Sequence, residues 1–142
     1  MKRWLAGVSV TALLCVATGL YGLPSPARAR AEVDHALGAR TANILTSGAT
    51  HVLGDYWAVW PSVFHANLTL YEQKSDRRIW GISHRSWATH DQWAATPATQ
   101  MRFAVPKGDL LWDHWRQEYA LPRLIQVEAL PTVDIYQAAG VP

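Results

Sequence analysis

The order of apolar and polar positions along the chain predicts a body in which helices and short strands alternate. Apolar residues at helical spacing predict a helix over 31–47, and a second helix is predicted to begin at Asp55 with Val59, Val63, Phe64 and Leu68 on one side. Short, partly β-branched runs bounded by glycine, proline or polar residues predict strands. The predicted strands are 51–54, 78–82, 101–105, 124–127 and 133–136.

Two further helices complete the alternation. A short one is expected over 89–95, and a longer one after Gly108-Asp109, where Asp109 would act as a cap. Regular alternation of helices and strands is typical of an α/β fold. We therefore expect a small, mostly parallel sheet with helices on both faces and an antiparallel last strand, preceded by one N-terminal apolar helix.

The N-terminus has the pattern of an export signal. Lys2 and Arg3 precede an uncharged apolar run of seventeen residues, Trp4–Leu20, and Ala27-Arg28-Ala29 has the small-x-small pattern of a leader-peptidase site. This pattern predicts a signal peptide or an uncleaved signal anchor over 1–29 and an exported domain over 30–142. The domain is then held at a bacterial inner membrane, facing the periplasm or the outside of the cell; the alternative is secretion after cleavage.

Composition narrows the function classes. The chain has thirteen Lys and Arg against eleven Asp and Glu, but Lys2, Arg3 and Arg28 belong to the leader, which leaves ten against eleven in the body. Such a body offers no basic face for a phosphate backbone, so no nucleic-acid partner is expected. The single cysteine, Cys15, lies in the apolar run, which excludes a disulfide, a thiolate nucleophile and a zinc knuckle from the body.

Candidate functional residues follow the first three predicted strands. Ligands of open α/β sheets bind at the carboxyl ends of the strands. Those ends carry Asp55-Tyr56-Trp57, Ser83-His84-Arg85 and Pro106-Lys107. The predicted rim therefore combines a carboxylate, two aromatic rings, an imidazole and two cations.

Asp55, Tyr56, Trp57 and Trp60 form the most unusual segment, in a body that holds seven of the eight tryptophans. Indole rings stack on the C–H face of a sugar while a carboxylate accepts its hydroxyls, so this segment indicates a saccharide site. The alternative is that Asp55 only caps the following helix and the aromatic rings belong to the core.

His84 and Arg85 suit an anionic group, because an arginine fork binds phosphate and a histidine adds a donor; the alternative is an ordinary polar loop. His84 and His90 lie six residues apart, which matches no familiar zinc spacing, and no glycine-rich phosphate loop is present. We therefore expect neither a metal nor a cofactor. Residues 67–69 (Asn-Leu-Thr) form a glycosylation sequon, relevant only in a host that uses it.

Signals for catalysis are weaker. The chain has no Gly-x-Ser-x-Gly elbow, and the carboxylates of Asp55 and Asp91 have no separation that a sequence can fix. A small secreted hydrolase that uses Asp55 or Asp91 with a histidine is one alternative function. A purely structural domain, with its tryptophans in the core, is another.

A family resemblance rests on three segments. They are 50–57 (THVLGDYW), 60–64 (WPSVF) and 78–85 (RIWGISHR). This pattern resembles the C-terminal extracytoplasmic domain of bacterial multi-span membrane glycosyltransferases that use polyprenyl-phosphate-linked sugars. In that domain an aspartate-tyrosine-tryptophan segment follows the first strand, an arginine follows the second, and a Val-x-x-Tyr strand ends the domain. Asp55–Trp57, Arg85 and Val133–Tyr136 occupy those places here.

The resemblance covers about Ala31–Tyr136 and the preceding apolar helix, and it implies a partner and a ligand. The ligand would be a glycan or a polyprenyl-phosphate sugar, the membrane contact would come through the N-terminal helix, and a membrane glycosyltransferase subunit would be the partner. Such enzymes carry their catalytic acids in loops between many spans, whereas this chain has one apolar segment. The chain is therefore expected not to be catalytic alone.

Overall fold

The computed structural model describes residues 2–22, 25–83, 101–109 and 124–138. The chain divides into two compact units, Met1–Asp34 and His35–Pro142, and the boundary lies a few residues beyond the predicted start of the exported domain at residue 30. The second unit contains a five-stranded sheet with helices packed on it, so the predicted α/β class and mostly parallel sheet are confirmed.

The first unit contains α1 (Lys2–Tyr21) and the beginning of α2 (Pro26–Thr46). Among the residues that the structure describes, no helix has both the length and the hydropathy needed to cross a membrane. Helix α2 begins five residues before the predicted start because Ser25 and Pro26 form an N-terminal cap: the Ser25 Oγ accepts from the Arg28 amide at 3.2 Å, and proline suits the first helical position.

The sheet has the strand order β2-β1-β3-β5-β4. Its strands are β1 (His51–Leu53), β2 (Trp80–Ile82), β3 (Arg102–Pro106), β4 (Leu124–Ala129) and β5 (Val133–Ala138). Strand β1 pairs in parallel with β2 and β3, and β5 pairs antiparallel with both β3 and β4. The prediction of an antiparallel last strand is therefore confirmed, and β2 and β4 form the two edges.

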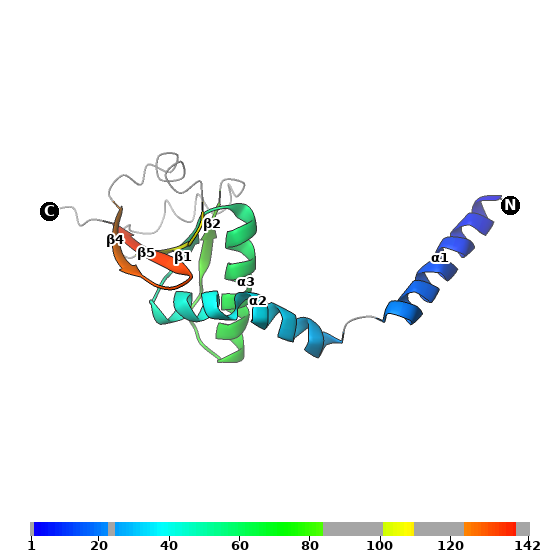
Figure 1. The fold of residues 1–142 in the computed structure, drawn as a ribbon, viewed down its shortest axis with the longest axis horizontal. Helices are drawn as coiled ribbons and strands as arrows, with labels where there is room; N and C mark the ends of the chain where they lie inside the picture. The colour runs from blue at the N-terminus through cyan, green and yellow to red at the C-terminus, as the bar shows by residue number, and fades with distance from the viewer. Residues whose placement is uncertain (1, 23–24, 84–100, 110–123, 139–142) are drawn as a thin grey trace. The chain divides into compact units, whose positions relative to one another are not determined.

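Helices α2 and α3 (Tyr56–Glu72) both pack on one face of this sheet (Figure 1). The core on this face is built from Ile44 and Ala49; from Val59, Val63, Ala66 and Leu70 of α3; and from Val52, Ile79, Ala104, Val133 and Ile135 on the sheet side. The four α3 residues recur at i, i+4, i+7 and i+11, which is the spacing of one helix face.

The opposite face of the sheet carries a second buried cluster. Its members are Leu53, Ile82, Met101, Phe103 and Val105, with Leu124 and Tyr136 packed beside them. Successive residues of a strand point to opposite faces, which is why Phe103 belongs to this cluster and Ala104 to the other. The helices predicted over 89–95 and after Asp109 lie outside the described residues.

Helix α3 differs from its prediction at Phe64. Pro61 lies in the second turn of the helix, so its nitrogen cannot donate to the Trp57 carbonyl four residues earlier. Phe64, expected on the apolar side, is 64% exposed, because the helix turns so that Ala66 continues the buried stripe from Val63. The expectation for Phe64 was wrong.

The two helices are joined by a buried polar contact. The Thr41 Oγ1 of α2 lies 2.7 Å from the His65 Nδ1 of α3, and both residues are buried. A buried polar group costs free energy unless it is hydrogen-bonded, so this pair fixes the register of one helix against the other.

Asn67 ties α3 to the chain entering β2. Its Nδ2 donates to the Ile79 carbonyl at 2.8 Å and to the Val63 carbonyl at 3.0 Å, and its Oδ1 accepts from the Ile79 amide at 2.9 Å. The side-chain amide thus satisfies both backbone groups of Ile79, as a neighbouring strand would. We call this arrangement the Asn67 clamp.

Candidate functional site

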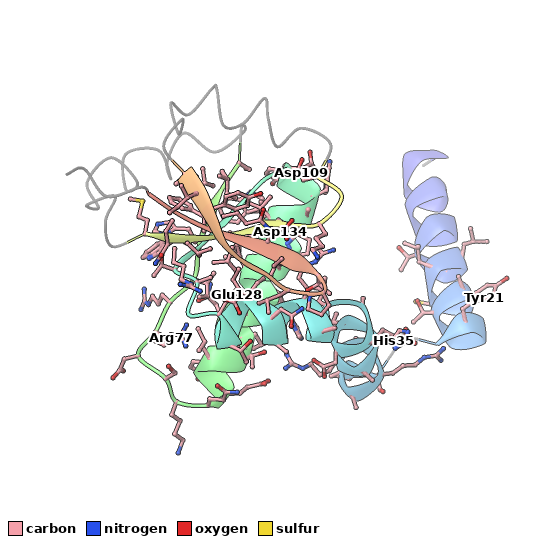
Figure 2. The ribbon with its side chains drawn as sticks, turned by 60° about the vertical axis from the view of Figure 1, so that its left-hand side comes forward. Tyr21, His35, Arg77, Asp109, Glu128 and Asp134 are labelled. Carbon is pink, nitrogen blue, oxygen red and sulfur yellow. The ribbon has the colours of Figure 1, made fainter. Side chains whose placement is uncertain are left out.

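The carboxyl ends of β1, β2 and β3 meet at one edge of the sheet, as expected for adjacent parallel strands. The amide of Asp55, the second residue after β1, donates at 2.9 Å to the Oδ2 of Asp109, a residue that follows β3. The Trp60 Nε1 donates at 3.2 Å to the Oγ of Ser83, the residue that follows β2. Figure 2 shows Asp109 beside the beginning of α3. We call this edge the rim.

Asp55 is the N-cap of α3. Its backbone is extended (φ −60°, ψ 142°), and its Oδ1 accepts from the Trp57 amide at 2.9 Å. The capping alternative that the sequence left open is therefore present, and it occupies one oxygen. Within the described ranges no other hydrogen bond reaches this carboxylate, so its second oxygen is available as an acceptor beside Trp57.

The three aromatic residues after Asp55 form a stepped cluster. The rings of Tyr56 and Trp57 meet edge to face, with centroids 5.2 Å apart and planes at 82°. The centroid of the Trp60 ring lies 6.3 Å from that of Tyr56. Trp57 is 72% exposed, whereas Tyr56 and Trp60 are half-buried. Trp57 is thus not a core residue: its ring is exposed and contacts the Tyr56 ring.

Gly54 permits the close approach of Asp109 to the β1–α3 junction. Its φ of +150° is unfavourable for residues with a side chain, and a Cβ built there would collide with the Asp109 carboxylate. We expect Gly54→Ala to lower the free energy of unfolding by about 2 kcal/mol, measured by urea denaturation. The control is Gly38→Ala in α2, where a Cβ meets no neighbouring atom, and which should leave stability unchanged or raise it slightly. Equal stability of the two variants would contradict this account.

The remaining predicted site residues are only partly described. His84, Arg85 and Asp91 lie outside the described residues, so the anion-binding half of the rim and the Asp55–Asp91 pair have no geometry here. Lys107 is exposed at the rim, and its Nζ lies 3.8 Å from the Asp134 Oδ1. In the part of the chain that the structure describes, no three histidine, cysteine or acidic side chains come together as metal ligands.

No protein-family model, no curated protein and no solved structure matches this chain. The resemblance to membrane glycosyltransferases therefore stays a prediction, and the functional argument depends on the geometry.

A groove that was not predicted from the sequence continues from Trp60 along β2. It has a volume of about 490 Å³. It is lined by Trp60, Val63, Asn67, Tyr71, Ser75, Arg77, Arg78, Ile79, Trp80 and Gly81. A signal was present: the four α3 residues follow one another at intervals of three, four and four, which places them on one side of a helix. This spacing does not reveal that β2 lies opposite these α3 residues.

Proposed function

We propose that this chain is an extracytoplasmic, membrane-anchored domain that binds a glycan or a lipid-linked sugar in a membrane glycosyltransferase system, and that it is not catalytic alone. The observation that carries the proposal is the exposed Trp57 ring, held edge to face by Tyr56 next to the Asp55 carboxylate. The export signal of the sequence supports the location, and the resemblance supports the partner.

The chemistry of the rim suits a sugar. The C–H face of a pyranose ring stacks on an indole, and its hydroxyls need acceptors close to the edge of that ring. One acceptor lies beside Trp57: the second oxygen of Asp55, whose first oxygen accepts from the Trp57 amide. It lies at the N-terminus of α3.

The test is a tryptophan-fluorescence titration of the full-length chain with short neutral oligosaccharides and with polyprenyl-phosphate sugars. We expect saturable binding, and we expect Trp57→Ala to weaken the affinity about tenfold. The variant loses one aromatic stack, worth roughly 1 kcal/mol, together with the apolar area that the stack buries. Asp55→Asn should also weaken binding, while it retains an oxygen for the helix cap and so leaves the melting temperature nearly unchanged.

The matched control is Phe64→Ala, which removes another exposed aromatic ring from α3. It should bind as the wild type does. Absence of saturation with every saccharide, or equal affinities for wild type and Trp57→Ala, would overturn the proposal and leave a structural role for the rim.

A further inference from the structure

The groove beside β2 has aromatic walls and a glycine floor. A Cβ on Gly81 would lie 3.0 Å from the Trp60 Cζ3 and 3.0 Å from the Val59 Cγ1, so any larger residue would require these side chains to shift; glycine lets the Trp60 ring lie close against the strand. Trp80 and Tyr71 flank this floor and are 41% and 79% exposed. The volume of the groove lies in the range of small-molecule sites, about 300–1,000 Å³.

Two arginines supply most of the free hydrogen-bond donors of this groove. The amide of Asn67 is used by the clamp, and the Ser75 Oγ accepts from the Arg77 amide at 3.2 Å. Arg77 makes one long contact, at 3.5 Å, from its Nη1 to the Leu45 carbonyl. Arg78 forms no hydrogen bond or ion pair with any residue that the structure describes. Most N–H groups of these two guanidiniums therefore have no hydrogen-bond acceptor among the described residues.

The lining also lacks a balancing negative charge: none of the described residues along the groove is acidic. Glu72 and Asp76 are close in sequence, but they are exposed and do not line it. A guanidinium fork without a carboxylate partner is suited to a carboxylate or phosphate brought by a ligand. Figure 2 shows Arg77 and Asp109 at opposite ends of α3, so Arg77 lies away from the Asp109 carboxylate at the rim.

We infer that this groove binds an anionic saccharide, that is, a sugar chain carrying carboxylate or phosphate groups. The rings of Trp60, Trp80 and Tyr71 take the apolar faces of the sugar, and Arg78 takes the anionic group, with Arg77 beside it. Trp60 belongs to both sites, because its ring contacts Tyr56 of the rim and Gly81 of the groove. The inference rests on the proposed function, to which it adds the charge class of the saccharide.

The test is isothermal titration calorimetry of the full-length chain at low salt. The ligands are a galacturonic acid tetramer, glucose 1-phosphate, and their uncharged counterparts, a galactose tetramer and glucose. We expect at least one charged ligand to bind about tenfold more tightly than its uncharged counterpart, which corresponds to one charge-assisted contact. The carboxylate and phosphate arms distinguish the two sources of the anionic group.

Variants separate the groove from the rim. Arg78→Gln should abolish the preference for the charged ligand. Trp80→Leu should weaken the binding of the charged ligand and leave the affinity for a neutral saccharide at Trp57 unchanged. The control Arg28→Gln removes the same charge from the N-terminal unit and should change nothing. A preference that survives Arg78→Gln, or equal affinities for charged and neutral saccharides, overturns the inference; neutral binding that still depends on Trp57 would leave the proposed function standing.

Discussion

Replacing Asn67 by alanine is expected to lower the free energy of unfolding by about 3 kcal/mol, since it removes three hydrogen bonds worth about 1 kcal/mol each. The penalty arises chiefly at Ile79, which is buried and loses the partners of both its amide and its carbonyl. Without the Asn67 clamp, the Ile79 amide and carbonyl lose their hydrogen bonds to α3. Urea denaturation at neutral pH measures the difference.

Two variants calibrate this result. Asn43→Ala removes an asparagine that makes a single side-chain contact, from its Nδ2 to the Thr132 Oγ1 at 2.8 Å, and should cost only about 1 kcal/mol. Asn67→Asp keeps the acceptor for the Ile79 amide but turns a carboxylate oxygen toward two carbonyls, so its loss of stability relative to the wild type should be larger at pH 7 than near pH 3, where the carboxyl is protonated and can donate again. If Asn67→Ala and Asn43→Ala proved equally stable, the clamp would not contribute as described.

Stability should also fall in mild acid because of His51. Its side chain is 5% exposed, its Nδ1 lies 2.8 Å from the Thr50 Oγ1, and its ring packs 5.5 Å from that of Phe103. Burial lowers the pKa of His51 from 6.5 to about 4. The unfolded chain therefore binds one more proton than the folded chain between these values. The contribution of neutral His51 is complete above pH 6.5 and is lost as the pH falls to about 4, up to about 3 kcal/mol.

The measurement is the free energy of unfolding of wild type and His51→Gln at half-unit steps from pH 7.5 to 4. Carboxylates add their own acid dependence to both proteins, so the informative quantity is the difference between the two curves. The wild type should lose stability more steeply, by up to about 1.4 kcal/mol per pH unit for one proton. His35→Gln, at an exposed histidine of α2, should follow the wild-type curve. Parallel curves for wild type and His51→Gln would refute a buried neutral His51.

Much of the sheet could be predicted because its strand ends are marked locally. Gly54 stops β1, the turn at Pro131 separates β4 from β5, and Asp55 marks the beginning of α3 with a residue type that caps helices. The start of α2 was missed although Ser25 and Pro26 signal it, because residues 26–29 were assigned to the leader instead.

What the sequence could not supply depends on tertiary contacts. Periodicity alone does not decide whether Phe64 or Ala66 continues the apolar stripe of α3, since each lies close to Val63 on the helix surface; packing against the sheet buries Ala66 and exposes Phe64. The Asn67 clamp joins residues twelve apart that belong to different elements. The groove likewise exists only because α3 docks beside the edge strand β2.

For the rim, the sequence presented two interpretations of Asp55 as alternatives, and the geometry makes them compatible. One oxygen caps α3 while the other remains available, and Trp57 projects outward while Trp60 supports the strand. The composition of the segment pointed to these residues. Which ring is exposed and which packs on the strand depends on the orientation of α3, and that orientation could not be predicted from the sequence.

The Asn67 clamp also has a consequence for biosynthesis. The sequon at 67–69 offers the Asn67 amide nitrogen to any secretion pathway that attaches glycans to chains before they fold, and that nitrogen is the one that donates to the Ile79 and Val63 carbonyls. A glycan there would be attached inside a contact that folding needs, so modified chains would be retained as misfolded material. If the chain is passed through such a pathway, we therefore expect Thr69→Ala, which removes the sequon, to raise the yield of folded protein.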